Sequence, residues 1–447
     1  LIYTSGSTGT PKGVAIRHKA VLATVADNAD LFNVHPGSRI LQVAPIGFDM
    51  SVFDLVLSLC CGGTLCLPSG GQKLIGDQLA KEIHGSRASH ICMTPSVLST
   101  LADTDQLASL TTITLAGEPL PGPLSRYWAR HRRVLNAYGP TEAAIASTCY
   151  LCPANEMEDP PIGRPLANVN CHVLDGHGAP VPIGVAGELH IGGAGVAQGY
   201  RDRPGLTAER FIPDPWSTQP GALLFKSGDI VKWRADGNLC FVGRNDGQVK
   251  LRGFRIELGE VESRLATHPL VTEAVVVLRE DAAREKQIVA YLVAAPGHEQ
   301  EQDVPKKLRS YLADFLPEYM IPGAFVVLQQ MPLTANGKLA HDRLPEPDST
   351  AFALAGFEAP ENLIADSWMD VLGRRGVGRH DNFFHLGGHS LLLFRVSARL
   401  SSAGVTVPLP DMFRYPTISG LAAHITGGLL GKGQTAAERL TEGLGGP

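Results

Sequence analysis

Charge is scarce in this 447-residue chain, and neither sign dominates it. Lys and Arg total 39 against 44 Asp and Glu, the net charge is −5, and charged residues make up only 19% of the sequence. A nucleic-acid-binding surface or a polybasic membrane anchor needs concentrated positive charge, which this balance does not provide. No apolar stretch reaches the length of a transmembrane helix. We therefore expect neither a nucleic-acid partner nor a membrane partner.

A disulfide framework is also missing, because the eight cysteines are scattered along the chain. Cys149 and Cys152 have CxxC spacing, but no second Cys or His pair follows at the spacing of a zinc site. Buried, reduced thiols in a cytoplasmic protein are the expected state. A signal peptide is likewise missing from the start, where Leu1 opens a short apolar run. From that opening we expect a chain that begins inside a domain.

The length is enough for about three domains, and the texture of the sequence changes twice. Up to about residue 215, apolar runs such as 40–43 and 112–115 alternate with helical segments such as 52–59, which is an α/β pattern. From about residue 166, short strands with Gly, Asp and Asn turns appear. The runs 225–233 and 239–242, joined through Asp-Gly, predict a β-hairpin.

The later part of the chain predicts two smaller units. A helix at 258–267, strands at 273–278, 288–293 and 324–328, and a helix at 304–315 form a small α+β pattern. A polar, proline-containing linker follows. Beyond it, helical periodicity at 362–372, 390–400 and 417–424 predicts a compact helical module, and the last stretch is rich in glycine.

The first chemical motif is a loop directly after the opening run, with the sequence Thr4-Ser5-Gly6-Ser7-Thr8-Gly9-Thr10-Pro11-Lys12-Gly13. Glycines allow the backbone to approach phosphates closely, hydroxyls and N–H groups donate to their oxygens, and the lysine supplies charge. The loop is not a Walker loop, because Pro11 stands before Lys12. A flexible Gly/Ser linker is the alternative, which Pro11 and Lys12 argue against.

Two further loops carry groups that suit a nucleotide. The segment Asn136-Ala137-Tyr138-Gly139-Pro140-Thr141-Glu142 could stack a base, meet a phosphate and hold Mg²⁺, or it could be an ordinary turn capped by Thr141. In the predicted hairpin, Asp229 could accept hydrogen bonds from ribose hydroxyls. Asp246, beside a glycine, is typical of a hinge. Each of these aspartates could equally be a plain turn carboxylate.

Lys338 and Ser390, in the later part of the chain, each have an ordinary structural interpretation when taken alone. Lys338 lies at a predicted loop tip, where a lone lysine is usually just solvated surface. Ser390 follows a glycine loop and precedes an apolar helical run, so it is a natural helix N-cap. A functional role for Ser390 requires a hydroxyl that is exposed and can be modified.

Together and in this order, the motifs resemble the adenylation domain of a non-ribosomal peptide synthetase followed by a peptidyl carrier (thiolation) domain. These proteins belong to the acyl-adenylate-forming superfamily. The resemblance covers nearly the whole chain. Further matching stretches are Phe48-Asp49-Met50-Ser51, residues 187–200, residues 248–260 and residues 316–322.

The resemblance implies the following architecture. Residues 1–245 would form an α/β large adenylation subdomain, incomplete at its start and with a β-rich portion, and residues 246–345 a small α+β subdomain. After a linker at 346–359, residues 360–428 would form an all-α, four-helix-type carrier domain, followed by a flexible tail at 429–447.

The resemblance also implies a two-step reaction. A carboxylate attacks the α-phosphate of ATP to give an acyl-adenylate, and the thiol of the carrier's 4′-phosphopantetheine arm then displaces AMP. Lys338 would stabilise the charge that builds up in the first step, Thr141 would meet the α-phosphate, and Glu142 would bind Mg²⁺. Asp246 would be the hinge that exchanges Lys338 for the segment 248–259 between the steps.

The remaining roles concern the nucleotide, the carrier and its partners. Ser390 would carry phosphopantetheine, added by a phosphopantetheinyl transferase, and neighbouring synthetase modules such as a condensation domain would be partners. The positions expected to contact ATP are Thr4, Ser5, Gly6, Ser7, Thr8, Gly9, Lys12, Asn136, Tyr138, Asp229 and Arg244.

The resemblance places Asp49 against the α-ammonium group of an amino-acid substrate. The rest of the expected substrate wall is Met50, Phe53, Cys92, Thr114, Ala116, Ala137, Ile145 and Ala146. None of these wall residues is charged, so a charged substrate side chain would be buried without a partner. We therefore expect an uncharged, mainly hydrophobic side chain.

Some departures and alternatives remain. Phe225 and Ser227 replace the usual Tyr and Thr of the family, and Ala340-His341 follows Lys338 where Asp-Arg is common. The chain could instead be an acyl- or aryl-CoA ligase, against which Asp49 and the Ser390 module argue. It could also be an inactive fragment that serves only as a carrier or scaffold.

Overall fold

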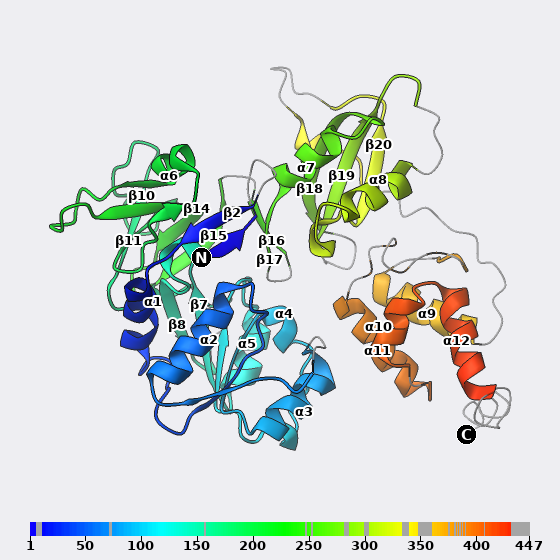
Figure 1. Ribbon diagram of the computed structural model, residues 1–447, viewed down its shortest axis with the longest axis horizontal. Coiled ribbons are helices and arrows are strands. Elements are labelled where there is room, and N and C mark those ends of the chain that lie inside the picture. Colours follow the sequence, from blue (N-terminus) through cyan, green and yellow to red (C-terminus); the bar gives the residue numbers. More distant parts are fainter. Residues whose placement is uncertain are drawn as a thin grey trace. The chain divides into compact units, whose positions relative to one another are not determined.

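The computed structural model describes most of the chain. The described residues are 1–5, 11–70, 74–155, 158–245, 248–251, 254–280, 286–298, 304–332, 339–346, 360–373, 376–379, 381, 383, 386, 388, 390–405 and 407–430. The chain divides into two compact units, Leu1–Glu260 and Val261–Pro447, and each is described by itself (Figure 1).

The first unit is built on a seven-stranded sheet in the order β4-β3-β5-β6-β7-β8-β9. The first five strands in that order run parallel, and β8 and β9 are antiparallel to their neighbours. The strands are β3 (Arg39–Leu41), β4 (Thr64–Cys66), β5 (His90–Met93), β6 (Thr112–Leu115), β7 (Arg133–Tyr138), β8 (Thr148–Cys152) and β9 (Arg164–Pro165). This arrangement confirms the α/β pattern predicted from the sequence.

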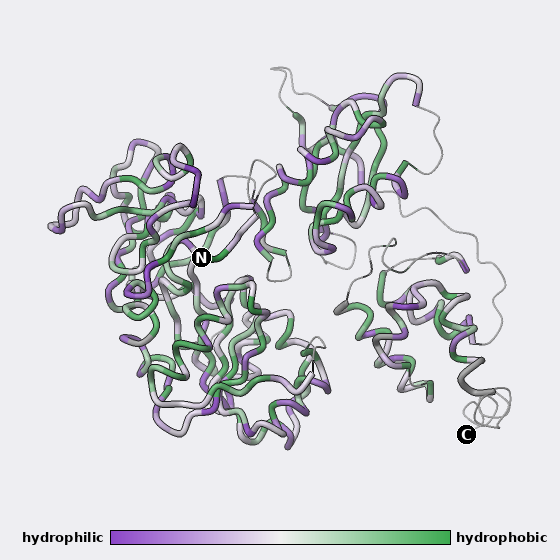
Figure 2. The backbone as a smooth tube through the Cα atoms, viewed as in Figure 1, coloured by the Kyte–Doolittle hydropathy of each residue, from purple (hydrophilic) through white to green (hydrophobic). Residues whose placement is uncertain are grey.

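Helices cover both faces of this sheet, because successive strand residues point to opposite sides. Ile40 and Cys92 pack in a cluster with residues of α1 (His18–Val25) and α2 (Asp49–Cys60). Leu41 and Ile91 pack in a second cluster with residues of α3 (Gly76–Ser86), α4 (Pro95–Leu98) and α5 (Gly122–Ala129). Apolar residues are correspondingly frequent in these strands (Figure 2). Short 3₁₀ turns complete this part at Ala26–Asn28, Asp105–Leu107 and Thr141–Ala143.

A β-rich portion follows, as the sequence predicts. One sheet has the order β1-β2-β12, and the other has the order β10-β11-β14-β13 with β15 also paired to β14. Their elements are β1 (Ile2–Thr4), β2 (Lys12–Ala15), β10 (Val169–Leu174), β11 (Gly187–Gly193), β12 (Gly199–Tyr200), α6 (Pro204–Arg210), β13 (Phe211–Pro213), β14 (Leu223–Trp233) and β15 (Leu239–Arg244). The hairpin expected at 225–242 is therefore the pair β14–β15.

A separate two-stranded hairpin closes the first unit. It consists of β16 (Gln248–Leu251) and β17 (Phe254–Glu257), paired antiparallel with Gln248 opposite Glu257. The hairpin falls within the compact unit that ends at Glu260. The segment predicted to reach the active site thus lies among the residues of that unit.

The second unit begins with a small α+β fold and ends with helices. Strands β18 (Val271–Glu280), β19 (Lys286–Ala294) and β20 (Ala324–Leu328) form a sheet in which β18 is antiparallel and β20 parallel to β19. The helices of this part are α7 (Leu258–Ala266), which starts before the boundary, and α8 (Val304–Ala313). Short 3₁₀ turns lie at Glu318–Met320 and His341–Arg343.

The helical module has four helices among its described residues: α9 (Glu361–Leu372), α10 (Ser390–Ser402), α11 (Leu409–Arg414) and α12 (Ile418–Leu430). Its core contains Trp368, which meets Phe383 edge-on at a ring distance of 4.9 Å, and Val396 of α10. The expected four-helix type is confirmed, although periodicity in the sequence does not locate α11. Six residues give less than two full turns of periodicity.

Two expectations drawn from the composition can be compared with the structure. All eight cysteines are free in this structure; four of them are buried and Cys60 is exposed, so the burial expected for all of them is only partial. Within the described residues, none of the helices combines the length and the apolar character needed to cross a membrane.

Candidate active site

The pairing of β14 with β15 places Asp229 directly opposite Arg244. The two side chains form an ion pair, and the guanidinium also donates to the Ser227 carbonyl at 3.1 Å. The Tyr138 hydroxyl, at the end of β7, donates to the other oxygen of the Asp229 carboxylate. Burial and the nearby carboxylate raise the pKa of Tyr138 well above its usual value. Three residues predicted to contact ATP therefore meet at one place.

Ser227 supports this arrangement, although the sequence alone shows only that it replaces the family's usual Thr conservatively. Its hydroxyl donates to the Leu189 carbonyl at 2.6 Å and accepts the backbone N–H of Asp229 at 3.0 Å. Both bonds are buried, so they fix the backbone from which the Asp229 carboxylate projects. The sequence does not indicate this role, because Ser227 is an uncharged polar residue of an ordinary kind close to Asp229.

Glu142 is fully buried in the turn after β7 and is surrounded by donors. One carboxylate oxygen accepts the Tyr200 hydroxyl at 2.8 Å, and the other accepts Nη1 of Arg255 at 2.7 Å. The Nζ atom of Lys12 lies 3.8 Å away. Burial raises the pKa of Glu142, but Arg255, Lys12 and Tyr200 outweigh it and hold the pKa at about 2. The carboxylate is therefore ionised at neutral pH.

Lys12 contributes to this charged cluster from β2. Its ammonium lies 3.6 Å from Glu257 and 5.0 Å from the centre of the Tyr200 ring. Burial and the neighbouring Arg255 lower its pKa, while Glu142 and Glu257 act in the opposite direction. A lysine this deeply buried needs such partners, because an unpaired ammonium would be costly there.

The hairpin β16–β17 is held against the same cluster through Arg255. Its Nε donates to Gln248 at 2.6 Å, and Gln248 in turn donates to Glu257. The backbone carbonyl of Arg255 accepts the Ser5 hydroxyl at 2.7 Å. Phe254 meets Phe48 edge-on at a ring distance of 5.4 Å. Ser5, expected to contact ATP, thus contacts the hairpin in this structure.

Asp49 is expected to bind the α-ammonium group of the substrate, and Thr141 is expected to meet the α-phosphate of ATP. These two side chains are in direct contact. The Thr141 hydroxyl donates to Oδ2 of Asp49 at 2.6 Å. Burial raises the pKa of Asp49, and the bond from Thr141 partly opposes this rise. Asp49 begins α2, whose N-terminus also favours a negative charge.

The expected substrate wall gathers beside these two residues. Phe53, Cys92, Ala137, Ile145 and Ala146 share one buried cluster, and Met50 and Ala116 pack against it. The Cys92 thiol lies 3.1 Å from the Met50 sulfur, and Thr114 is buried on β6. Burial raises the pKa of Cys92 well above its usual value, so the thiol stays neutral. The wall is apolar apart from hydroxyl and sulfur atoms.

Other predicted residues have less to show. Asn136 is buried on β7 and donates to the carbonyls of Pro160 and Pro161, which makes it a structural support in this conformation. Thr4 ends β1 with its hydroxyl buried and with no hydrogen-bond partner among the described residues. Ser390 is the first residue of α10. Gly6, Ser7, Thr8, Gly9, Asp246 and Lys338 lie outside the described residues.

Tyr200 and Arg255 are two further site residues to which the sequence analysis gave no individual role. Both lie in stretches that match the family, and Glu142 joins them only because distant segments meet in the fold. One buried carboxylate of this kind fits Mg²⁺, which usually takes one or two protein carboxylates together with substrate phosphates. Glu142 would be the residue that holds the ion.

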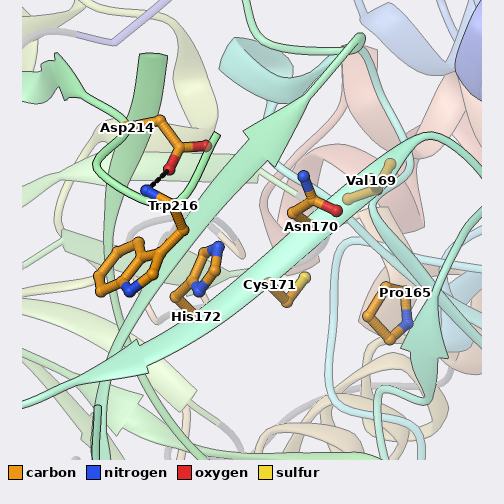
Figure 3. A pocket seen from close by; sticks show the side chains of 7 residues that line it. All are labelled: Pro165, Val169, Asn170, Cys171, His172, Asp214 and Trp216. Carbon is orange, nitrogen blue, oxygen red and sulfur yellow. Dashed lines mark hydrogen bonds between the residues drawn. The ribbon is translucent and has the colours of Figure 1, made fainter. Parts of the chain in front are cut away.

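A cavity of about 350 Å³ lies elsewhere in the β-rich portion. Trp216 stacks on His172 at a ring distance of 4.4 Å, and the backbone N–H of Trp216 donates to Asp214 at 2.9 Å (Figure 3). None of the predicted site residues lines it. This cavity and the predicted chemistry therefore do not coincide.

Comparison with known families agrees with the geometry. Residues 1–201 match the AMP-binding enzyme family, residues 260–338 its C-terminal domain, and residues 362–425 the phosphopantetheine attachment site. The three matches follow the order of the large subdomain, the small subdomain and the carrier predicted from the sequence.

Curated relatives come from peptide synthetases. The chain is 44% identical over 432 residues to phosphinothricin tripeptide synthetase PhsC of Streptomyces viridochromogenes, a match that covers 95% of this chain and 39% of that protein. It is 44% identical over 435 residues to malpinin synthetase of Mortierella alpina, covering 95% of this chain and 6% of that protein. The chain thus spans well under half the length of these relatives.

Solved structures give the same result. The chain resembles holo-PA1221, a non-ribosomal peptide synthetase protein with adenylation and carrier domains bound to a vinylsulfonamide inhibitor, with a TM-score of 0.78 and 28% identity over 98% of this chain and 73% of that one. It also resembles IdnL1, with a TM-score of 0.63 and 30% identity over 72% of this chain and 67% of that one. The chain therefore belongs to the non-ribosomal peptide synthetase family of acyl-adenylate-forming proteins, as an adenylation region followed by a peptidyl carrier domain.

Proposed function

We propose that this chain activates an α-amino acid with ATP and loads it onto its own carrier domain. The amino acid would become an aminoacyl-adenylate with release of pyrophosphate. The phosphopantetheine thiol on Ser390 would then displace AMP and leave the amino acid as a thioester. The family membership supports the reaction class, and the geometry of the first unit supports the placement of the substrates.

The contact between Thr141 and Asp49 is the observation that carries this proposal. An α-amino acid has its ammonium and carboxylate on the same carbon. A residue that binds the ammonium and a residue that meets the α-phosphate must therefore lie within a few ångströms of each other. The 2.6 Å bond between these side chains satisfies that requirement. A ligase for acids without an amine has no need of a carboxylate at this position.

The nucleotide would be bound by groups already paired with one another. The Asp229 carboxylate would accept the ribose hydroxyls while the ion pair with Arg244 keeps it oriented. Tyr138, at the end of β7, would pack against adenine, and Thr141 would donate to the α-phosphate. Mg²⁺ on Glu142 would neutralise charge on the phosphates. Lys338 would bridge the substrate carboxylate and the phosphate where negative charge builds up.

The substrate wall favours an uncharged, mainly hydrophobic amino-acid side chain. Phe53, Cys92 and Ile145 are buried in the apolar cluster beside Asp49. Nine residues are assigned to the substrate, and among them only Asp49 has a charged side chain. Its carboxylate would already be paired with the α-ammonium group. A charged substrate side chain would then lose hydration without gaining a partner.

The remaining steps need other proteins. A phosphopantetheinyl transferase would modify Ser390, and a condensation domain of a neighbouring module would accept the loaded amino acid. The eight free cysteines are consistent with a cytoplasmic location, where thiols stay reduced.

Amino-acid-dependent exchange between ATP and pyrophosphate tests the proposal. We expect exchange with one or a few hydrophobic amino acids and little with Asp, Glu, Lys or Arg. Lys338→Ala should lower the exchange rate by about a hundredfold or more, because it removes a charge that acts in the transition state. Lys307→Ala on α8 is the matched control and should retain the activity of the original chain.

The alternatives give different results in the same assay. Exchange with carboxylic acids that lack an amine would favour an acyl- or aryl-CoA ligase. Exchange with no acid, in a chain that still accepts phosphopantetheine on Ser390, would favour a carrier or scaffold. Either result would contradict the proposed amino-acid activation.

A further inference from the structure

The expected substrate wall contains a strained turn. Ile145 adopts a φ of 82°, and the preceding Ala144 adopts a φ of 57°. Residues with side chains rarely occupy this left-handed region, and a β-branched residue such as isoleucine is poorly suited to it. The backbone N–H of Ala146 donates to the Ala144 carbonyl at 3.1 Å, which together with the φ of Ile145 indicates a γ-turn of the rare, strained kind. Such strain persists only where the surroundings hold the backbone in place.

The conformation of this turn sets the shape of the wall. Ile145 and Ala146 both belong to the wall, and they are buried in one cluster with Phe53 and Cys92. Ile145 is the central residue of the turn, so its φ sets the direction in which its side chain leaves the backbone. If Ile145 relaxed to a negative φ, that side chain would leave its place in the cluster. The pocket would then lose the shape that distinguishes one apolar amino acid from another.

A hydroxyl from a distant part of the chain binds the turn. Thr24, fully buried on α1, donates to the Ala144 carbonyl at 2.9 Å. Two carbonyls of its own helix, those of Ala20 and Val21, lie farther from the hydroxyl, at 3.1 and 3.3 Å. A hydroxyl has a single proton to donate, and carbonyls inside a helix already accept backbone amides. The Ala144 carbonyl is therefore the acceptor that gains most from Thr24.

The segment after β11 packs against the same turn and fixes its other end. A Cβ atom at Gly195 would lie 2.6 Å from Cγ2 of Thr24 and 3.0 Å from the Ala143 carbonyl oxygen, so glycine allows this close approach. The backbone N–H of Ala197 donates to the Glu142 carbonyl at 2.9 Å. Glu142 is thus anchored without Thr24, and loss of the Thr24 hydroxyl should disturb the wall more than the residues assigned to the chemistry.

We propose that Thr24 is a positioning residue for the amino-acid pocket: its hydroxyl holds the Ala144 carbonyl and thereby keeps Ile145 in the conformation that shapes the substrate wall. Thr24 acts through Ile145 and does not touch the substrate. The inference rests on the proposed function, because that function assigns Ile145 to the amino acid. It places a determinant of substrate selectivity on α1, a helix that contributes none of the expected wall residues.

Pyrophosphate exchange in the full chain tests the inference with two variants. Thr24→Val keeps the branched shape and removes the hydroxyl, whereas Thr24→Ser keeps the hydroxyl. The probe is the hydrophobic amino acid that gives the highest exchange rate. In Thr24→Val its KM should rise about fivefold, the loss expected for one hydrogen bond, while kcat and the KM for ATP stay within about twofold. Selectivity against an amino acid one methylene longer or shorter should fall by a similar factor, and Thr24→Ser should retain most of both.

Thr100→Val is the matched control. The Thr100 hydroxyl donates to the Val97 carbonyl at 2.7 Å and accepts the Gly76 N–H at 2.9 Å, beside α3 and α4 and away from the substrate wall. This variant loses bonds of the same kind in the same unit, so urea denaturation should show a loss of stability, as in Thr24→Val. Its KM values and its selectivity should match those of the original chain. A purely structural role for Thr24 would give both variants the same kinetic behaviour.

Hydrogen exchange follows the turn without any turnover. The backbone amides of residues 144–147 should exchange about fivefold faster in Thr24→Val than in the original chain, because the bond that holds the turn is lost. In Thr24→Ser and in Thr100→Val, these amides should exchange at nearly the original rate.

The outcomes separate this inference from the proposed function. If Thr24→Val retains the amino-acid KM and the selectivity of the original chain, the inference is wrong and amino-acid activation still stands. Equal rises in the KM values for the amino acid and for ATP would also overturn the inference, since they would show a general distortion of the site. If the original chain shows no amino-acid-dependent exchange, the proposed function fails, and hydrogen exchange alone then decides whether Thr24 holds the turn.

Discussion

At the scale of single residues, the site combines side chains whose role can be predicted from the sequence with side chains whose role appears only in the structure. Tyr138 and Asp229 lie in segments whose composition already suits a nucleotide, and the fold brings them into contact with each other at the strand position opposite Arg244. Tyr200 and Arg255 serve Glu142 from distant segments. A single sequence cannot show that pairing, because neither residue differs in type or local pattern from a surface residue.

The Asp229 carboxylate provides a direct residue-scale prediction. Asp229→Asn removes the anion that Arg244 and Tyr138 share and would weaken the proposed bonds to the ribose. Hydrogen bonds to charged groups contribute about 1.5–3 kcal/mol, so the KM for ATP in pyrophosphate exchange should rise about 10- to 100-fold. Asp236→Asn, at the far turn of the same hairpin, should leave the KM unchanged. An unchanged KM in Asp229→Asn would exclude the proposed ribose role.

Asp54 of α2 provides a second prediction, which concerns stability. Its side chain is fully buried, neither carboxylate oxygen has a hydrogen-bond partner among the described residues, and burial raises its pKa well above the usual value. The folded chain therefore holds this proton at pH values where the unfolded chain has lost it. Stability falls as the pH rises from about 4 towards the raised pKa.

Asp54→Asn removes this pH dependence. Because the folded chain no longer has to keep a proton on this residue, the variant should have a larger free energy of unfolding than the original chain at pH 7. The gain should disappear at about pH 3, below the pKa of the unfolded carboxyl group. Urea denaturation at both pH values measures the difference. Asp202→Asn, an exposed matched change, should shift stability at neither pH, and a gain that persists at the acidic pH would refute the titration argument.

At the scale of elements, strand register decides what the site can do. The pairing of β14 with β15 sets Asp229 opposite Arg244, and a shift of one residue would turn both side chains to other faces. The hairpin itself was predictable from its alternating residues and its Asp-Gly turn. The helix α11 was not, since a six-residue helix has too few turns for its periodicity to stand out from a loop.

Gly228 links this register to binding. It adopts a φ of 74° between Ser227 and Asp229, and a residue with a side chain is strained there by about 1–2 kcal/mol. Gly228→Ala should lower stability by about that amount and also raise the KM for ATP, because the strain is relieved by tilting Asp229. Gly237→Ala, with a φ of 79° at the other end of the hairpin, is the matched control. It should lose similar stability without a change in KM, and equal KM values for the two variants would contradict the positioning argument.

At the scale of the whole molecule, the α/β, small α+β and helical textures of the sequence each correspond to a folded part. Hydrophobic periodicity made this division predictable, because each part buries its own core. The boundary at Glu260 was less predictable. In the sequence, the hairpin β16–β17 falls in the stretch expected to form the small α+β subdomain. In the structure, Arg255 of this hairpin contacts Glu142 and Ser5, and the hairpin belongs to the first unit.

Because the carrier and the adenylation region have separate hydrophobic cores, a mutation that unfolds one of them should leave the activity of the other intact. Trp368→Ala removes a buried side chain from the carrier core and should cost about 3–5 kcal/mol there. The variant should therefore lose modification of Ser390 while amino-acid-dependent pyrophosphate exchange continues at the original rate. Trp216→Ala, which removes a tryptophan that is 43% exposed, should keep both activities. Loss of exchange in Trp368→Ala would show that the carrier core supports the adenylation chemistry.

The most direct test of the central claim is the intact mass of the whole chain after two successive incubations. A phosphopantetheinyl transferase with coenzyme A should add one phosphopantetheine group, and Ser390→Ala should prevent this addition. ATP, Mg²⁺ and a hydrophobic amino acid should then add the mass of that amino acid less one water, and Lys338→Ala should slow this second addition about a hundredfold or more while leaving the first unchanged. A chain that gains the first mass but never the second, with any amino acid, would contradict the account.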